Sequence, residues 1–173
     1  MHPCATCASI QKTCCQRAEI VLTAGDVERI ESYTARGRAA FVERRAPADP
    51  AYLEADPDDP NWVRYTVAPD GTRRVLRRRA GGDCTFLGEQ GCVLPTEVRP
   101  LVCRLYPFMY NEERLSGSDQ TYCPVSRLAP PGVTMLTVLG MDPADGERWR
   151  RALYAELRAE AESPAAETRI AHR

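Results

Sequence analysis

The chain has 173 residues and a formal net charge of −1, with 14 prolines, 11 glycines and few aromatic residues. A net charge this close to zero excludes long-range attraction to nucleic acid or to an anionic membrane as the basis of function. The length suits one domain with a tail. The loop-rich composition implies a modest apolar core that needs a covalent or metal-mediated cross-link.

Four of the eight cysteines lie in the N-terminal segment CATCASIQKTCC, at positions Cys4, Cys7, Cys14 and Cys15. This segment lacks the basic stretch and apolar run of a secretory signal. No stretch of the chain approaches the roughly 20 apolar residues of a membrane-spanning helix. We therefore expect a cytoplasmic protein, in which clustered thiols stay reduced and bind a metal or carry out redox chemistry rather than form disulfides.

The spacing of these cysteines suits metal ligation. Cys4-x-x-Cys7 allows two thiolates to face one ion across a tight turn. Cys14 and Cys15 are adjacent, and adjacent side chains of an extended chain point to opposite sides. They would therefore reach two different ions, or one ion and a redox partner, unless the backbone turns sharply between them.

The segment that follows is predicted to be helical. Thr23 and Asp26 have the spacing of a capping box, and apolar residues then recur at helical intervals. We expect a helix from about Ala24 to Ala35 and a second one from Arg38 to Arg45. The acidic, proline-rich stretch at residues 46–61 is expected to form a surface loop.

A β-hairpin is predicted next, because Pro69-Asp70-Gly71 marks a turn between two β-rich runs. Its strands are expected at Trp62–Ala68 and Thr72–Arg78. Five arginines lie in or just after the second strand: Arg73, Arg74, Arg77, Arg78 and Arg79. We interpret them as solvated edge-strand charges that block aggregation, and a phosphate-binding nucleic-acid patch is the alternative.

A second short hairpin is expected between Cys84 and Cys92, where Gly88 and Gly91 bracket a turn. A three-residue loop would place both sulfurs on one face, and a four-residue loop would place them on opposite faces. The sequence leaves both registers open.

The last two cysteines are Cys103 and Cys123. Cys103 is expected on a single helical turn, because Pro100 suits the start of a helix and Pro107 cannot continue one. Cys123 precedes a proline, which favours an extended backbone.

Eight cysteines are enough for two four-thiolate sites. All-sulfur coordination favours zinc or iron, including an iron–sulfur cluster, over calcium and magnesium, which prefer oxygen ligands. Such sites are negatively charged, so we expect Arg99 and Arg104, which flank Cys103, to donate N–H groups to sulfur. Structural zinc supplies roughly 10–16 kcal/mol, so the metal-free chain should be largely unfolded.

A C-terminal amphipathic helix is predicted after Asp142-Pro143, with Trp149, Leu153 and Leu157 along one stripe. We divide the chain into a cysteine-cluster metal-binding domain, residues 1–128, and an extension, residues 129–173, whose helix packs on that domain. The expected fold class is α+β: a small, irregular, metal-stabilised domain with short β-hairpins and a few helices.

These motifs resemble the CxxCxxCC zinc- or iron-chelating domain family, the YkgJ-type cysteine-cluster proteins. The resemblance runs from about residue 4 to 125, and GCVLPTEVRPLVCRLYP is its most specific part. It implies a cytosolic bacterial metal-chelating domain with eight ligand cysteines. Similar clusters appear in flagellin lysine methylases, which hints that some members support methyl transfer. The chain departs from the family pattern because six residues, not two, separate Cys7 from the Cys14-Cys15 pair.

The expected function is chelation of zinc, iron or an iron–sulfur cluster by Cys4, Cys7, Cys14, Cys15, Cys84, Cys92, Cys103 and Cys123. No phosphate loop, acid–base pair or partnered nucleophile stands out, so we expect a binding module rather than an enzyme on its own. The alternatives are an iron–sulfur-dependent enzyme, such as a methyltransferase, and a thiol redox sensor. The metal ion is the expected partner. We expect no membrane association and no nucleic-acid ligand, and the sequence identifies no protein partner.

Overall fold

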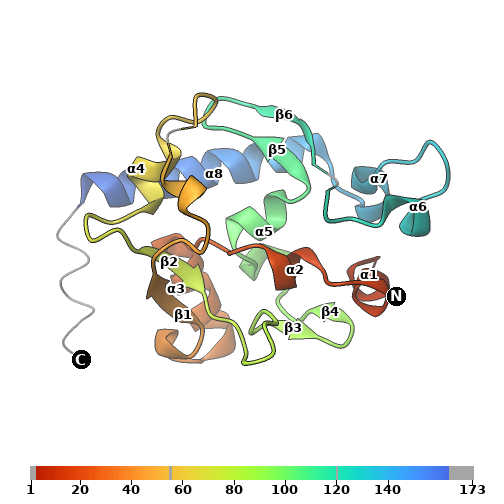
Figure 1. Ribbon diagram of the computed structural model, residues 1–173, viewed down its shortest axis with the longest axis horizontal. Coiled ribbons are helices and arrows are strands. Elements are labelled where there is room, and N and C mark those ends of the chain that lie inside the picture. The colour runs from red at the N-terminus through yellow and green to blue at the C-terminus, as the bar shows by residue number, and fades with distance from the viewer. Residues whose placement is uncertain (1–2, 55, 120, 164–173) are drawn as a thin grey trace.

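The fold combines short helices with small antiparallel sheets, and the computed structural model describes residues 3–54, 56–119 and 121–163 (Figure 1). The α-helices are α1 (Pro3–Ile10), α2 (Cys14–Arg17), α3 (Ala24–Thr34), α4 (Trp62–Thr66), α5 (Leu101–Leu105), α6 (Val125–Leu128), α7 (Met135–Leu139) and α8 (Pro143–Glu162). Short 3-10 turns cover Arg38–Ala40, Pro50–Leu53 and Thr96–Val98. The expected α+β class is confirmed.

The strands are β1 (Val42–Arg45), β2 (Arg73–Leu76), β3 (Leu87–Gly88), β4 (Gly91–Cys92), β5 (Phe108–Tyr110) and β6 (Leu115–Ser118). They pair as separate two-stranded antiparallel sheets, β1 with β2, β3 with β4 and β5 with β6. Sheets this small cannot bury a large apolar face, so helices and loops supply much of the core.

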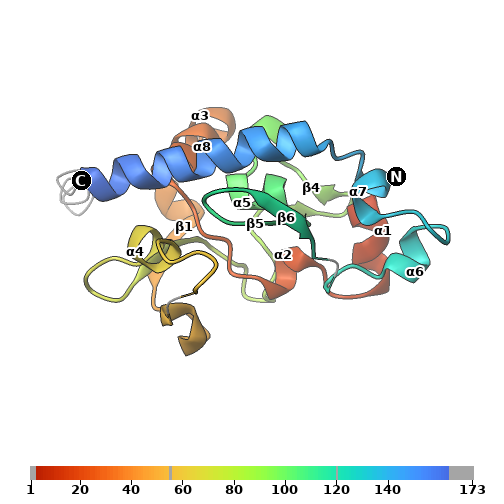
Figure 2. The ribbon, with the colours of Figure 1, turned by 90° about the horizontal axis from the view of Figure 1, so that it is seen from above.

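The core consists of two apolar clusters. The first cluster contains Ile20, Leu22, Val27, Ile30, Phe41, Leu76, Cys84, Phe86 and Leu94. The second cluster contains Leu101, Leu105, Trp149, Leu153, Tyr154 and Leu157. Val102 on α5 packs against both. Helix α5 therefore joins the part of the molecule that carries α3 to the long helix α8, which crosses one side of the fold (Figure 2).

Two predicted helices are confirmed with their caps. Thr23 caps α3, because its hydroxyl accepts the N–H of Asp26 at 2.9 Å while the Asp26 carboxylate accepts the N–H of Thr23 at 3.1 Å. Asp142 caps α8 by accepting the N–H of Ala144 at 2.8 Å, and Pro143 occupies the first helical position. The predicted stripe of α8 is buried in the second cluster.

The predicted helix over residues 38–45 is wrong. Ala35 adopts a left-handed conformation with φ of 52° and ends α3. After a 3-10 turn, the chain forms β1, in which Val42 is opposite Leu76 and Arg45 is opposite Arg73. Pairing with β2 satisfies backbone groups that a helix would have satisfied internally.

The predicted hairpin between residues 62–68 and 72–78 is also wrong, although its turn is present. Gly71 has φ of 78°, and the N–H of Ala68 donates to the carbonyl of Thr72 at 2.8 Å. The segment before this turn is helix α4, because helical spacing lets Trp62 and Tyr65 pack together on the second cluster. Strand β2 pairs with β1 instead.

None of the helices in the described part of the chain is long and apolar enough to span a membrane.

Candidate metal centre

Four cysteines from three separate segments gather in the first cluster, and we call Cys15, Cys84, Cys92 and Cys103 the Cys15 group. Cys84 is a buried member of that cluster, and the other three are partly buried against it. Burial raises the pKa of Cys103 well above its ordinary value, and the neighbouring thiols Cys15, Cys84 and Cys92 raise it further. The four thiols therefore lie around the same apolar cluster, and their charges affect one another's ionisation.

Helix α2 presents Cys15 to this group and is fixed at both ends. Gln16 closes a capping box by accepting the N–H of Thr13 at 2.8 Å, and its amide donates to Asp83 at 2.5 Å. Arg78 donates to the carbonyls of Gln16, at 2.6 Å, and Ala18. These bonds hold α2 against residues 78–83, directly before Cys84.

The hairpin that carries Cys84 and Cys92 has a register in which Leu87 is opposite Cys92 and Gly88 is opposite Gly91. Regular alternation in this register would turn the two sulfurs apart. A turn at Cys84–Leu87, closed by a 3.0 Å hydrogen bond from the N–H of Leu87 to the carbonyl of Cys84, interrupts the alternation. Burial raises the pKa of Cys84 to about 12, and the nearby thiols Cys15 and Cys92 contribute to that rise. Both sulfurs therefore face the same cluster.

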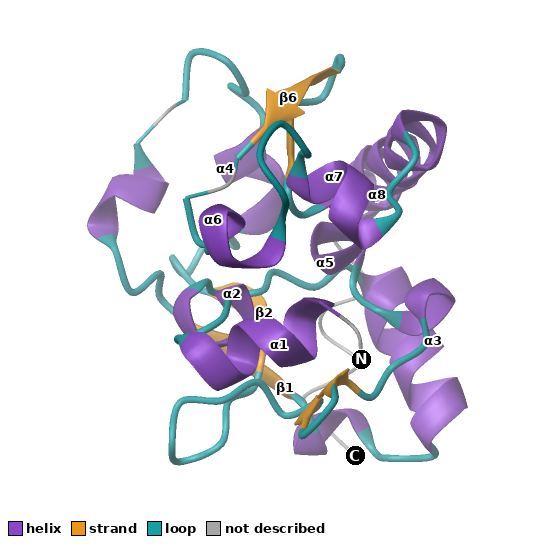
Figure 3. Cartoon of the chain, turned by 90° about the vertical axis from the view of Figure 1, so that its right-hand side faces the viewer, coloured by secondary structure: helices purple, strands orange, loops and turns teal. Residues whose placement is uncertain are grey.

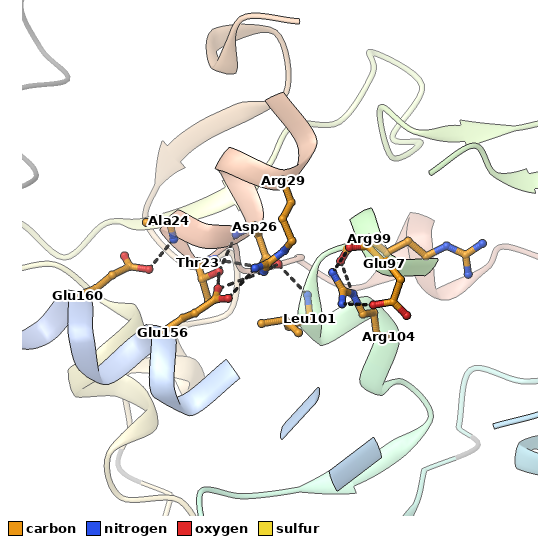
Figure 4. Close-up of polar contacts among 10 residues, drawn as sticks. All are labelled: Thr23, Ala24, Asp26, Arg29, Glu97, Arg99, Leu101, Arg104, Glu156 and Glu160. Atoms are coloured by element: carbon orange, nitrogen blue, oxygen red, sulfur yellow. Dashed lines mark hydrogen bonds and ion pairs between the residues drawn. The ribbon is translucent and has the colours of Figure 1, made fainter. Parts of the chain in front are cut away.

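Cys103 lies on α5, whose start is fixed from a distant part of the chain. Pro100 provides no side-chain cap, and the buried Asp26 carboxylate accepts the N–H of Leu101 at 3.0 Å instead (Figure 4). Asp26 also pairs with Arg29 at 2.6 Å, and Arg29 pairs with Glu156 on α8. The position of Cys103 thus depends on contacts among α3, α5 and α8.

Three further cysteines form what we call the Cys7 group: Cys14 and Cys123 lie beside Tyr106, and Cys7 lies near Cys123. The Tyr106 hydroxyl lies 3.5 Å from the sulfur of Cys123. Burial raises the pKa of Tyr106, and Cys123 and Cys14 add to the rise. Burial also raises the pKa of Cys7, with Cys123 as the largest neighbouring charge.

The elements that carry the Cys7 group meet in the same region. Helix α1 contacts both β4 and α6, the helix that begins just after Cys123. Figure 3 shows α1, α2 and α6 on one side of the molecule. Cys4 lies in the first turn of α1, but its side chain is outside the described part of the structure, as are His2 and His172.

Cys14 and Cys15 form the boundary between the two groups. They open helix α2, so the backbone between them is helical and not extended. Cys15 accepts a hydrogen bond from Cys14, which lowers the pKa of Cys15 to about 7; Thr13, Arg99 and Arg78 also lower it. Cys15 neighbours the sulfurs of the first cluster, whereas Cys14 acts on Tyr106. Cys15 also raises the pKa of Cys7, so Cys15 lies near thiols of both groups.

Positive charge lies beside both groups, but one predicted partner is wrong. Arg99 lowers the pKa of Cys92 by charge and by a side-chain hydrogen bond, against the larger opposing effect of burial. The charge of Arg17 likewise lowers the pKa of Cys7, against the larger opposing effect of burial. Arg104 does not donate to sulfur. Its guanidinium donates instead to the carbonyl of Arg99 at 2.8 Å and to Glu97. These bonds stabilise the turn before α5.

The described thiols of each group lie near one another, but they are not arranged as the ligands of a metal ion. Among the side chains that the structure describes, no three Cys, His, Asp or Glu residues form a group that could hold a metal ion. All the described cysteines are free thiols. Their chemistry suits soft, thiophilic ions such as zinc and iron once the protons are lost.

Sequence reasoning missed the residues that position the cysteines. The Asp26–Leu101 bond joins positions 75 residues apart, and Gln16–Asp83 joins positions 67 apart. Neither pair has a local sequence signal. The polar identity of Asp26 did signal a cap for α3, but its second carboxylate bond depends on tertiary structure.

Residues 3–124 match the family model CxxCxxCC, described as "Putative zinc- or iron-chelating domain". No curated protein and no solved structure matches the chain.

Proposed function

The chain belongs to the CxxCxxCC family of zinc- or iron-chelating domains, and on that basis we propose that its own eight cysteines bind zinc or iron. The observation that carries this proposal is the convergence of Cys15, Cys84, Cys92 and Cys103, from three separate segments, on one apolar cluster. Buried thiols so close together repel one another once ionised, and a bound cation would remove that repulsion.

We assign the eight cysteines to two four-thiolate sites. The first site comprises the Cys15 group, Cys15, Cys84, Cys92 and Cys103. The second comprises the Cys7 group, Cys7, Cys14 and Cys123, together with Cys4. The charges that act on each thiol support this division. Beside burial, Cys15, Cys84 and Cys92 raise the pKa of Cys103, and Cys123 is the strongest neighbouring charge on Cys7, ahead of Cys15. Cys4 is assigned from its Cys4-x-x-Cys7 spacing.

The surroundings of the first site suit a negatively charged metal centre. Four thiolates around one divalent ion carry a net double negative charge. Arg99 and Arg78 lie close enough to lower the pKa of Cys15, and the same charges would offset that of the site. The bound ion would act as a structural cross-link and a store of metal. The residues around it would keep α2, the β3–β4 hairpin and α5 together.

Metal binding would close the fold across a long stretch of chain. The first site joins residue 15 to residues 84–103, and the second joins residues 4–14 to residue 123. Structural zinc supplies roughly 10–16 kcal/mol, which is comparable with the whole stability of an ordinary domain. We propose that residues 129–173 form an extension that braces this domain, in keeping with the packing of α8 on α5. We further propose that the protein is a cytoplasmic binding module.

Anaerobic purification followed by metal analysis and a visible spectrum tests this function. We expect either a colourless protein with two zinc ions or a brown protein with iron and acid-labile sulfide. Removal of the metal with a chelator should abolish most of the far-ultraviolet circular dichroism. Protein without stoichiometric zinc or iron, or native material with cystines among the eight residues, would contradict the proposal.

A further inference from the structure

A pocket of about 430 Å³ lies where β2, α4 and the last turns of α8 meet. This is the opposite end of the molecule from α1 and α6 (Figures 1 and 2). The lining includes the apolar residues Leu22, Pro69 and Leu157, together with Tyr65. The size is typical of pockets that bind small molecules, roughly 300–1,000 Å³.

The same pocket is lined by four arginines: Arg44, Arg64, Arg73 and Arg74. Glu160 is the one carboxylate among its described lining residues. Both of its oxygens are engaged. One accepts the N–H of Ala24 at 2.5 Å (Figure 4), and the other pairs with Arg74 at 2.6 Å. With four arginines and one carboxylate, the described lining carries a net positive charge.

Acidic residues outside the lining offset part of this charge. Glu19 pairs with Arg73, but it also pairs with Arg45 at 2.9 Å, so one carboxylate serves two guanidinium groups. Asp70 lies near Arg44, and its carboxylate also accepts hydrogen bonds from the N–H and hydroxyl of Thr72. Arg64 is exposed and forms no ion pair with any described residue.

Arg73 provides a second, independent indication of a ligand. Its side chain is only 2% exposed, and its guanidinium lies 4.4 Å from the centre of the Tyr52 ring. Its Nε atom is buried and has no hydrogen-bond acceptor among the residues that the structure describes. A buried charged donor without an acceptor is costly, and an oxygen of a bound anion would supply the missing acceptor.

We propose that this pocket binds a small organic anion, with its carboxylate or phosphate group against the arginines and its apolar body against Leu22, Pro69 and Leu157. Guanidinium groups bind the oxygens of either anion in pairs of parallel hydrogen bonds. The apolar lining residues would favour an anion with a ring or alkyl chain over inorganic phosphate. The pocket shares no lining residue with the two cysteine groups.

A nucleic-acid strand fits this surface less well than a small anion. A strand requires exposed cations along one face. Here Arg73 is buried, Arg74 pairs with Glu160, and Arg78 donates to backbone carbonyls beside α2. The arginines between residues 73 and 79 therefore take part in different interactions.

The proposal is tested by titrating the full-length, metal-loaded chain with benzoate, phenyl phosphate and neutral benzyl alcohol. Two-dimensional NMR spectra recorded at each step of the titration give the readout. We expect saturable shifts for at least one of the anions, localised to α4, the following turn and β2, and none for the alcohol. Comparing benzoate with phenyl phosphate distinguishes carboxylate from phosphate recognition. Shifts centred on the cysteine segments would instead indicate that the anion binds the metal directly, and would overturn the proposal.

Arg64→Gln removes one exposed guanidinium from the rim and should weaken anion binding about tenfold. Arg151→Gln on the far part of α8 changes the net charge equally and should leave the affinity unchanged. Unchanged metal content and circular dichroism establish that both variants are folded. Equal weakening in both variants, or no saturable binding of either anion, would overturn the proposal. So would a single-stranded oligonucleotide that binds through Arg77 and Arg79.

Discussion

The carboxylate of Asp26 accepts a hydrogen bond from the backbone N–H of Leu101 at 3.0 Å, across 75 positions of sequence. The same carboxylate caps its own helix through Thr23 and pairs with Arg29. Because Leu101 begins the helix that carries Cys103, Asp26 connects the N-terminal half of the fold to a proposed metal ligand.

Asp26→Ala should destabilise the fold and weaken the first metal site. It leaves the buried N–H of Leu101 without an acceptor and removes a helix cap, at a combined cost of about 2–4 kcal/mol. Asp26→Asn keeps an acceptor oxygen and should cost less. Denaturant unfolding and chelator competition measure the two effects. Asp145→Ala serves as the control, because Asp145 lies in the first turn of α8 with its side chain 42% exposed. An Asp26→Ala protein as stable as this control would refute the role of Asp26.

Arg99→Gln should weaken metal binding at the first site with little effect on the second. Arg99 lies beside Cys92 and Cys15, and its Nε donates to the carbonyl of Leu94 at 2.9 Å. Loss of such a neighbouring group typically lowers metal affinity about 10–100-fold. Arg99→Lys keeps the charge and should recover part of the affinity. Competition with a chelator of known affinity would show the effect, and Arg148→Gln controls for net charge. Equal affinities in all three variants would argue against charge compensation.

Gly146→Ala tests whether α8 is packed tightly on the β5–β6 sheet. A Cβ atom at this position would lie 2.6 Å from the Phe108 ring and 3.0 Å from Leu115. We expect a net loss of about 1 kcal/mol, because overpacking outweighs the higher helix propensity of alanine. Gly37→Ala, where a Cβ meets no atom within 4 Å, should be nearly neutral. A stabilised Gly146→Ala protein would mean that α8 is loosely seated.

Asp59→Asn should raise stability at neutral pH. Burial raises the pKa of Asp59, and the nearby carboxylates Glu112 and Asp56 contribute, although a hydrogen bond from Tyr154 opposes the shift. A carboxyl whose pKa is higher in the folded than in the unfolded state contributes most when protonated. That contribution is lost as pH rises through the folded pKa.

The asparagine stays neutral and can still accept the hydrogen bond from Tyr154. The gain should be on the order of 1 kcal/mol at pH 8 and should shrink towards pH 5. Melting temperatures of both proteins with excess metal would reveal it. A lower melting temperature for the variant across this range would show that Tyr154 requires a charged acceptor.

Local signals in the sequence predicted the features that depend on neighbouring residues. The capping box of Thr23 and Asp26, the Pro143 start of α8 and the apolar stripe of that helix are all of this kind. For the segment Trp62–Thr66 the same reasoning gave a wrong prediction. Its β-rich composition favours a strand, but packing of Trp62 on Tyr154 of α8, with ring centres 6.2 Å apart, selects a helix. Such packing has no local signature.

The candidate site likewise combines features that the sequence predicts with features that depend on tertiary structure. The cysteines and their soft-metal chemistry could be read from composition and spacing. The grouping of Cys15 with Cys84, Cys92 and Cys103 could not, because it depends on a turn at Cys84–Leu87 and on long-range bonds that hold α2. Arg104 illustrates the limit: next to Cys103 in sequence, it is committed to Glu97 and the carbonyl of Arg99.

The most direct test of the proposed sites is the metal content of paired cysteine-to-serine variants. Cys84→Ser with Cys103→Ser removes two ligands of the first site, and Cys103→Ser with Cys123→Ser removes one ligand of each. If the two sites are independent, the first pair should lose half of the bound metal and the second pair nearly all of it. Equal losses in the two double variants, or full metal content in either, would contradict the two-site account.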